Sequence, residues 1–487
     1  MHLGRWNVAL LAVALTTTVM GAVMVRDSDR ARGSAVQSAL PGSRPALDPF
    51  LNELEERTFR YFWQTANPQN GLIPDRYPTT PSVSSIAAVG FGLTAYPIGV
   101  ERGYVTREAA RQRVLATLHF LRDAPQGRSA RGVSGYKGFF YHYLDMKTGD
   151  RFEDSELSTV DTAILLAGVL FCESYFDGPG TEEAGIRNLA EQIYDRVDWR
   201  WAQHNAPAIS HGWTPEEGFL EYDWRGYNEA MLVYLLALGS PTYPVGPQAW
   251  TEWTSTYDKS WRKVFGQEYL AFAPLFGHQY THVWMDFRNI QDDYMRRRGL
   301  DYFENSRRAV YAQQAYAIAN PLHCADYGAT IWGITASDGP ANVELADVGA
   351  SEKRVYRGYA ARGTDAHDDC TLAPTAAVAS IPFAPELAIP AVLEMHRRFG
   401  QYIYSAYGFY DAFNPSFHFD VPLLHGHDVA GFGWVDGDYI GIDEGPICAM
   451  IENERSALIW RVMRKNPHFR RGLERAGFSG GWLTATK

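Results

Sequence analysis

The feature that most constrains the fold is an irregular repeat of loops that combine glycine, aromatic residues and acids. The six loops begin near Gly71, Tyr136, Gly212, Gly277, Trp332 and Tyr407. By subtraction of these positions, successive loops start 65, 76, 65, 55 and 75 residues apart. Five of them lead fairly directly into an apolar helix pattern, whereas alternating strand patterns are scarce. Self-similarity at such a period is typical of stacked helix pairs.

Six helix pairs close naturally into an (α/α)6 toroid, so we predict an all-α fold of this kind. The apolar helices are expected inside, the amphipathic helices outside, and the six loops together at one end. An open solenoid is the alternative, although solenoids normally show tighter repeats. Residues 46–487 are predicted to form one domain.

The last loop leads into residues 433–460, which read GWVDGDYIGIDEGPICAMIENERSALIW. Asp443 and Glu444 lie here, near Trp434 and before an apolar helix pattern. Pro446 suits the first turn of a helix, where its missing N–H would have no partner anyway. We therefore expect the helix to begin near Pro446, with the two carboxylates just before it at the mouth of a polar site.

The composition excludes several classes of function. The chain has 487 residues, and 46% of them are hydrophobic, which is ample for a large core. The net charge of −11 and the lack of a basic patch argue against a nucleic-acid partner. The four cysteines show no CxxC or Cys/His spacing, so we expect no zinc site and no other cofactor.

The cysteines fall into two pairs by context. Cys172 and Cys448 lie inside apolar helix patterns, which predicts small buried side chains. Cys324 and Cys370 lie in loops, where an oxidising compartment would allow them to pair. The sequence alone does not fix that pairing.

Residues 1–25 form a leader with Arg5 ahead of a long apolar run, and residues 26–45 form a flexible linker. The leader is a secretory signal or an uncleaved membrane anchor, because the run is close to the length that spans a bilayer. Both readings place the body of the protein in the periplasm or outside the cell.

Three carboxylates stand out as catalytic candidates, namely Asp161, Glu229 and Asp443. Glu229 immediately precedes a wholly apolar helix, so we expect it to be partly buried. A buried carboxylate must be paired or hydrogen-bonded, or have a raised pKa, and a raised pKa is what a general acid needs. Asp161 is in the first turn of an apolar helix, where favourable interaction with the helix dipole is the simpler explanation. Cleavage of a glycosidic bond needs one acid and one further carboxylate, which is the chemistry that such a set suits.

Aromatic and polar side chains in the same loops are candidates for sugar binding, and core packing or loop bracing is the alternative for each of them. The candidates are Trp213, Trp224, Tyr227, Asn228, His278, His282, Trp284, Asp286, Arg288, Trp332, Tyr410, Trp434 and Glu444. The secondary acidic candidates are Glu221, Asp223, Asp368 and Asp369.

Several separated blocks resemble the bacterial glucoamylase-like domain family, which includes the endo-β-1,2-glucanases of glycoside hydrolase family 144. The blocks, in chain order, are SSIAAVGFGLTAYPIGVERGYVTREAA, GYKGFFYHYLDMKTG, ELSTVDTAILLAGVL, GYNEAMLVYLLALGSP, PLFGHQYTHVWMDFR, DYFENSRRA, WGITASDGP and GIDEGPICAMIENERSALIW. The resemblance runs across almost the whole chain after the leader.

This resemblance implies an (α/α)6 glucoamylase-like catalytic domain that hydrolyses β-1,2-glucan with inversion and without a metal. It matches Asp161, Glu229 and Asp443 to functional positions, without deciding which is acid and which is base. Glu444 is a departure, because relatives are expected to carry glutamine there, and it would add charge at the mouth of the site. The expected partners are β-1,2-glucan or its oligosaccharides, and the expected state is a monomer or weak oligomer.

Two other functions stay open at this point. One is an exo-acting enzyme that releases the disaccharide sophorose, or a transglycosylase. The other is a non-catalytic glycan-binding protein, in which the same aromatic funnel would hold a sugar without cleaving it.

Overall fold

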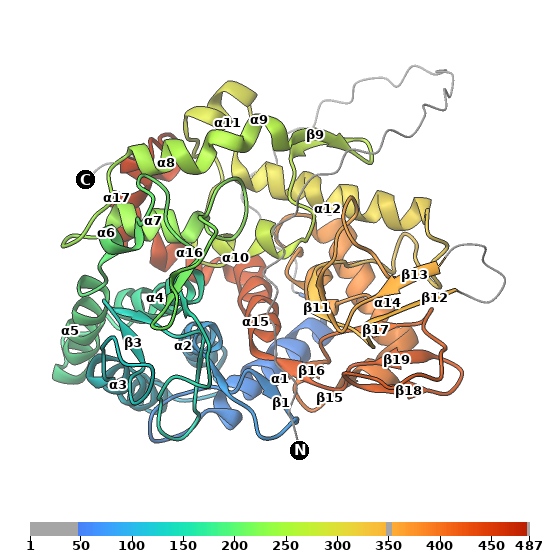
Figure 1. Ribbon diagram of the computed structural model, residues 1–487, viewed down its shortest axis with the longest axis horizontal. Coiled ribbons are helices and arrows are strands. Elements are labelled where there is room, and N and C mark those ends of the chain that lie inside the picture. Colours follow the sequence, from blue (N-terminus) through green and yellow to red (C-terminus); the bar gives the residue numbers. More distant parts are fainter. Residues whose placement is uncertain (1–46, 347–352, 485–487) are drawn as a thin grey trace. The chain divides into compact units, whose positions relative to one another are not determined.

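Six inner helices and their partners build the fold, in a computed structural model that describes residues 47–346 and 353–484 (Figure 1). The predicted leader and linker lie outside the described residues. Residues 47–487 cluster into one unit. The inner helices are α2 (Ile86–Arg102), α4 (Thr159–Tyr175), α7 (Met231–Gly239), α10 (Phe276–Trp284), α13 (Pro374–Val378) and α15 (Gly441–Ser456).

Each inner helix follows an outer helix in the chain, which confirms the predicted (α/α)6 arrangement. The outer helices are α1 (Pro49–Thr65), α3 (Arg107–Asp123), α5 (Thr181–Asp195), α8 (Gln248–Trp253), α12 (Tyr302–Ala319) and α14 (Pro385–Ile403). The shorter helices are α6 (Trp199–Ala202), η1 (Thr254–Thr256), α9 (Tyr257–Ser260), α11 (Asp293–Arg298), α16 (Leu458–Met463), α17 (Pro467–Arg475) and α18 (Gly481–Thr484).

The burial of the helices follows from their side chains. Every residue of α7, MLVYLLALG, is buried, and α2 and α4 are buried along nearly their whole length. A helix that is apolar on all sides must lie in the core, whereas an amphipathic helix such as α1 presents one face to water. The apolar helices therefore build the inner ring, as the repeat predicted, but Gly277 lies inside the inner helix α10 and not in a loop as expected.

Glycines set the spacing between three inner helices. A β-carbon at Gly168 of α4 would lie 2.1 Å from the carbonyl oxygen of Gly90 on α2, and one at Gly90 would lie 2.4 Å from the carbonyl oxygen of Ile164. A β-carbon at Gly445 of α15 would lie 2.1 Å from the ring of Phe91 on α2. The backbones of α2, α4 and α15 thus approach one another to distances that only glycine permits.

Prolines inside the inner helices leave carbonyl groups that other helices satisfy. Pro97 lacks the N–H that would bond to Leu93, and the thiol of Cys172 on α4 instead contacts the Leu93 carbonyl oxygen at 3.1 Å. Pro446 leaves the Ile442 carbonyl free in the same way, and it accepts the hydroxyl of Tyr280 at 3.1 Å. Each proline therefore becomes a point where two inner helices are joined.

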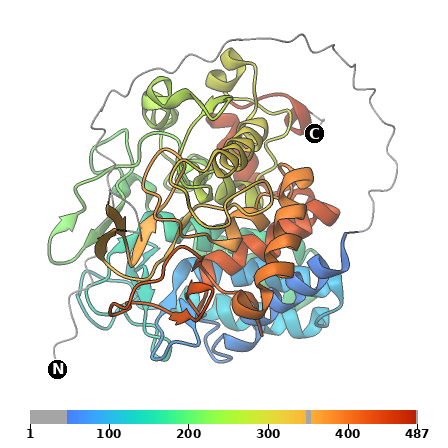
Figure 2. The same cartoon turned by 90° about the vertical axis from the view of Figure 1, so that its right-hand side faces the viewer.

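Short antiparallel ladders tie the loops together, and Figure 2 shows most strands and loops on the left with the helices on the right. β1 pairs with β20, so the loop before α2 is joined to the loop before α15. The strands are β1 (Arg76–Tyr77), β2 (Ser84–Ser85), β3 (Gly135–Tyr136), β4 (Phe139–Phe140), β5 (Tyr143–Leu144), β6 (Leu157–Ser158), β7 (Gly212–Thr214), β8 (Gly218–Phe219), β9 (Trp261–Val264), β10 (Gln267–Leu270), β11 (Ala336–Asp338), β12 (Val343–Ala346), β13 (Lys353–Tyr356), β14 (Tyr359–Ala361), β15 (Tyr404–Ser405), β16 (Gly408–Phe409), β17 (Phe413–Asn414), β18 (His427–Val429), β19 (Gly433–Val435) and β20 (Tyr439–Ile440).

The expected start of the last inner helix was wrong. α15 begins at Gly441, five residues before Pro446, so Asp443 and Glu444 lie within its first turn rather than ahead of it. Proline is tolerated this far inside because the carbonyl that it leaves unbonded has Tyr280 as its partner.

The four cysteines occupy the expected environments. Cys324 and Cys370 form a disulfide, and Cys172 and Cys448 are buried thiols. Within residues 47–346 and 353–484, no helix combines the length and the apolar character needed to cross a bilayer.

The glycine contact between α2 and α4 predicts that two Gly→Ala substitutions change the free energy of unfolding in opposite directions. Gly168→Ala should destabilise the protein by about 1–3 kcal/mol, because its β-carbon would overlap the backbone of α2. Gly185→Ala, in α5, should stabilise it by about 0.4–1 kcal/mol, because its β-carbon has room and alanine favours the helix. Denaturant unfolding measures both, and equal effects of the two substitutions would contradict the close approach.

Candidate functional site

The three catalytic candidates lie at the N-terminal ends of three inner helices. Asp161 lies in the first turn of α4, Glu229 lies two residues before α7, and Asp443 lies in the first turn of α15. Asp161 is close enough to Glu229 to raise the pKa of that glutamate, and both Glu229 and Asp443 act on the pKa of Tyr280. The fold therefore brings the three carboxylates around one space.

Asp161 has a polar environment. Its carboxylate accepts a short hydrogen bond from the Ser158 hydroxyl at 2.5 Å and lies 3.7 Å from Nε2 of His142. Nδ1 of His142 lies 2.9 Å from Glu156. Burial lowers the pKa of His142, but Asp161 and Glu156 outweigh it and raise that pKa to about 10. His142 is therefore a cation at neutral pH, held between two carboxylates.

Glu229 has the opposite environment. Its side chain is half-buried, and its Oε2 atom has no hydrogen-bond partner among the described residues. Burial, with a further contribution from Asp161, raises the pKa of Glu229 to about 7. A carboxyl group that keeps its proton near neutral pH is suited to general acid catalysis.

Asp443 forms an acid pair with Asp411, which lies in the loop before β17. Burial and the Asp411 charge raise the pKa of Asp443 well above its usual value, which places the proton of the pair on Asp443. Burial and Asp338 raise the pKa of Asp411 to about 7. Two buried carboxylates this close cannot both ionise, so the pair shares one proton.

Arg76, in β1, is a cation that contacts three further acids of this region. Its guanidinium donates to Asp338 at 2.8 Å and lies 3.4 Å from Asp438 and 3.6 Å from Asp75. The backbone N–H of Asp338 in turn donates a hydrogen bond to the Asp411 carboxylate at 2.8 Å. A hydrogen-bond chain thus runs from Arg76 through Asp338 to the Asp411–Asp443 pair.

Several predicted sugar contacts are contradicted by burial. Trp284, Trp332 and Trp434 are at most 1% exposed, and Trp284 and Trp434 use their indole N–H groups on Thr94 and on the His425 carbonyl. These rings form the core because they lie on inner helices or between packed loops, where no sugar can reach them.

The polar cluster on and after α10 is also structural. His278 and His282 are 1% exposed, and burial lowers the pKa of each to about 3. Asp286, also 1% exposed, pairs with Arg288 at 2.7 Å and with Arg464. Arg288 lies over the ring of Trp460. Asp286 and Arg288 follow the C-terminal end of α10, whereas the catalytic candidates lie at helix N-termini, so both were wrongly predicted as sugar contacts.

The remaining aromatic candidates are mostly buried as well. Trp213 packs on Trp201, Trp224 stacks on His211 and donates to Thr159, and Tyr227 lies 3.4 Å from the Ser306 hydroxyl. Asn228, next to Glu229, caps the turn by accepting the N–H of Ala230. Tyr410 is half-buried against Tyr439. Tyr410 and Asn228 are the two of this group that keep substantial exposure.

Glu444 does not add charge at the mouth, in contrast to the expectation. It is 1% exposed, and burial raises its pKa well above the usual value, so it is neutral. Its side chain points towards Thr58 of α1. Consecutive residues of a helix project about 100° apart, so Asp443 can face the site while Glu444 faces the core.

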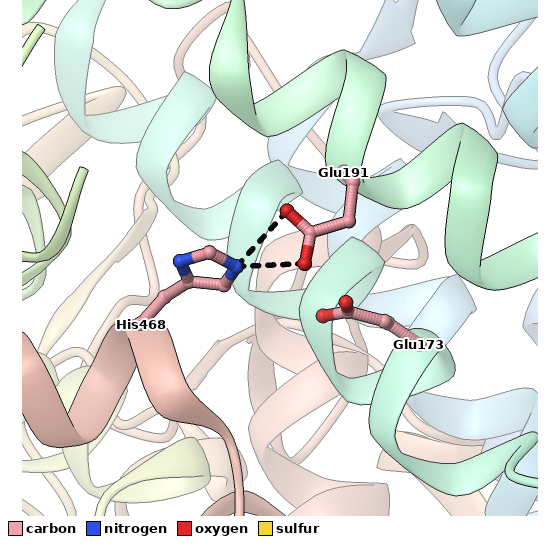
Figure 3. A group of neighbouring side chains, drawn as sticks. All are labelled: Glu173, Glu191 and His468. Carbon is pink, nitrogen blue, oxygen red and sulfur yellow. Dashed lines mark hydrogen bonds and ion pairs between the residues drawn. The ribbon is translucent and has the colours of Figure 1, made fainter. Parts of the chain in front are cut away.

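Among the residues that the structure describes, two groups could hold a metal ion. Glu173, Glu191 and His468 converge in Figure 3, where Nε2 of His468 lies 3.0 and 3.1 Å from the Glu191 oxygens. This group is about 18 Å along α4 from Asp161, at the other end of the helix. The second group is Asp338, His425 and Asp436, but the Arg76 guanidinium already contacts Asp338 and lies 3.3 Å from His425.

Sequence reasoning missed several residues that surround the three candidates. They are Arg76, His142, Tyr143, Tyr280, Asp338, Tyr359 and Asp411. Four of the six glycine-rich loops supply Asp75 or Arg76, His142, Asp338 and Asp411, so the repeat already contained the signal. A rule that takes the charged residue of every such loop would have found them.

Comparison with known proteins gives a consistent family. The model of the family described as putative glucoamylase matches residues 221–467. A crystal structure of a putative glucoamylase from Bacteroides uniformis is 30% identical, with 91% of this chain and all of that chain covered and a TM-score of 0.78. The endo-β-1,2-glucanase of Chitinophaga pinensis, solved with sophorotriose and glucose, is 27% identical, with 90% and 100% covered and a TM-score of 0.76.

A curated relative has a different name and a longer chain. The exo β-1,2-glucooligosaccharide sophorohydrolase (non-reducing end) of Parabacteroides distasonis is 28% identical over 459 residues, which cover 88% of this chain. The match spans 58% of that relative's length.

The secondary candidates Asp368 and Asp369 serve the structure. Asp368 accepts the hydroxyls of Tyr316 and Tyr327 at 2.7 and 3.1 Å. Asp369 pairs with Arg362 at 2.7 Å, and both side chains are fully buried. Burial would raise the pKa of Asp369, but the Arg362 guanidinium outweighs it and holds that pKa far below its usual value. Glu221 is exposed, and Asp223 pairs with Arg225.

Removal of one partner from the Asp369–Arg362 pair should be costly. Asp369→Asn should destabilise the protein by about 3–5 kcal/mol, because it leaves a buried guanidinium without its counter-charge. Asp365→Asn, which removes the half-exposed partner of Arg262, should cost about 0–1 kcal/mol.

Unfolding measured against pH adds a second readout. The contribution of Asp369 is present above the pKa of an unfolded aspartate, about 3.9, and is lost as the pH falls below it. The acid-induced loss of stability should therefore be smaller in Asp369→Asn. A variant as stable as the wild type would show that this pair does not brace the fold.

Proposed function

Because this chain belongs to the family of putative glucoamylases, we propose that it is a glycoside hydrolase that cleaves β-1,2-glucan. The observation that carries the proposal is the contrast between two neighbouring carboxyls. Glu229 keeps its proton near neutral pH because it is buried, whereas Asp161 is hydrogen-bonded to Ser158 beside the His142 cation. Groups with such different environments suit the acid and base roles of glycoside hydrolysis.

Glu229 is the general acid in this proposal. Its proton passes to the glycosidic oxygen as the bond to the anomeric carbon breaks, and a water molecule adds to that carbon from the opposite face. Asp443 and Asp161 are the two candidates that would position and deprotonate the water. In the case of Asp443, the pair holds one proton and one negative charge at neutral pH, so Asp443 accepts the proton of the water as its own proton passes to the Asp411 carboxylate.

The substrate follows from the named relatives. The Chitinophaga pinensis relative is an endo-β-1,2-glucanase, and the match covers 90% of this chain and all of that one. Internal cleavage with inversion is therefore the leading form of the proposal, and it requires no metal. Release of sophorose from the non-reducing end is the second form, because the Parabacteroides distasonis relative carries that name.

The periplasm, or the outside of the cell, is the proposed location. The leader and linker of residues 1–45 support export, and the Cys324–Cys370 disulfide supports an oxidising compartment. Fractionation of cells that produce the full chain should recover it outside the cytoplasm with that disulfide formed. Recovery from the cytoplasm with four free thiols would contradict the location.

Hydrolysis of linear β-1,2-glucan is the direct test. The purified protein should generate new reducing ends, and intermediate chain lengths should appear before sophorose if cleavage is internal. Glu229→Gln and Asp443→Asn should each lower kcat by about a hundredfold to ten-thousandfold, because each removes a proton-transfer group or its partner. Glu221→Gln, an exposed acid of the same loop, should leave the rate unchanged.

The pH profile identifies the role of Glu229. In the wild type, kcat/KM should fall as the pH rises through about 7, since the protonated form of Glu229 is the active one. The fall should be absent in the residual activity of Glu229→Gln. A folded wild type that produces no reducing ends would exclude the hydrolase, and an active Glu229→Gln would exclude this residue as the acid.

A further inference from the structure

Tyr359 lies on the strand β14, which pairs with β11 in antiparallel register. Asp338 is directly opposite Tyr359 in that pair. Side chains that are directly opposite on paired strands point to the same face. Because Asp338 points to Arg76 and the acid pair, the ring of Tyr359 points to the same region.

The ring of Tyr359 has no evident structural role. It is 58% exposed, which makes it one of the two most exposed large hydrophobic side chains on the described surface together with Ile318. Among the described residues, it makes no ring contact, and its hydroxyl has no hydrogen-bond partner. Single exposed aromatic side chains are common on protein surfaces, so it is the position of Tyr359 opposite Asp338 that singles it out.

The hydroxyl of Tyr359 lies near the carboxylates of the candidate site. Surrounding protein atoms raise its pKa, and further contributions come from Asp443, Asp338, Asp411 and Glu229. These four acids lie on separate segments of the chain, so the Tyr359 hydroxyl is within electrostatic reach of each of them. Tyr359 also contributes to the raised pKa of Tyr280 and of Tyr143.

We propose that Tyr359 is a sugar platform, whose exposed ring packs against the glucosyl unit held between Glu229 and Asp443. The inference deepens the proposed function and rests on it. A flat ring covers the C–H face of a pyranose, and a free hydroxyl can donate to a sugar oxygen. Trp284, Trp332 and Trp434 cannot supply this surface because they are buried.

The platform is held by a braced support. Arg362 follows Tyr359 by three residues and forms the buried ion pair with Asp369. The next residue, Cys370, is joined to Cys324 by the disulfide. A site gains from such support, because a platform that moved would lose the geometry that binding requires.

Three variants test the platform. Tyr359→Ala should lower kcat/KM for linear β-1,2-glucan about tenfold or more, and Tyr359→Phe should retain most of the activity because it keeps the ring. Tyr243→Ala is the matched control, since Tyr243 is 42% exposed and follows the C-terminal end of α7, away from Glu229. All three should unfold at the temperature of the wild type, because an exposed ring contributes little packing.

Calorimetry separates the contribution of Tyr359 to sugar binding from any contribution to catalysis. In the inactive Glu229→Gln background, Tyr359→Ala should weaken the binding of sophorotriose about tenfold, and Tyr243→Ala should not change it. An unchanged kcat/KM and an unchanged affinity in Tyr359→Ala would overturn the inference. A wild type that binds sophorotriose without hydrolysing glucan would overturn the proposed function alone. The affinity of Tyr359→Ala for sophorotriose would still test the role of Tyr359.

Discussion

The close approach of α2 to α4 and α15 is the constraint on which the site depends. Glycines at Gly90, Gly168 and Gly445 allow these backbones to lie closer than any side chain would permit. Because Asp161 and Asp443 lie in the first turns of α4 and α15, this spacing fixes the distance across which the two carboxylates act. A small shift of either helix would therefore change the distance between the two carboxylates, because a close-packed core is barely compressible.

The site concentrates more acids than it has cations to balance them. Arg76 holds Asp338 and lies near Asp75 and Asp438, and His142 stands between Asp161 and Glu156. Glu229 and the Asp411–Asp443 pair retain protons because burial raises their pKa values. Burial also outweighs Arg76 at Asp75 and Asp436, whose pKa values are raised. Burial and the placement of the two cations together thus separate proton donors from proton acceptors within the site.

The sequence allowed the fold and the three principal carboxylates to be predicted, because both depend on local pattern. The repeat of apolar helices determines the toroid, and acids at helix N-termini must meet once the helices are parallel. Trp284 and Trp434 were misassigned because a buried ring and a sugar platform have the same local sequence context, and only tertiary packing separates them. Glu444 was misplaced because a one-residue step turns a side chain from the site to the core. Tyr359 could not be chosen in advance, since its place opposite Asp338 depends on a strand pair between separate segments.

The disulfide between Cys324 and Cys370 has a thermodynamic consequence beyond its local contacts. It closes a segment with a sequence separation of 46 residues, which contains β11 to β14 and therefore Asp338 and Tyr359. In the chain-entropy account, closing a loop of that length lowers the entropy of the unfolded chain, which stabilises the folded state by about 4 kcal/mol. The segment between the two cysteines is thus supported by the lower conformational entropy of the denatured ensemble, in addition to its own packing.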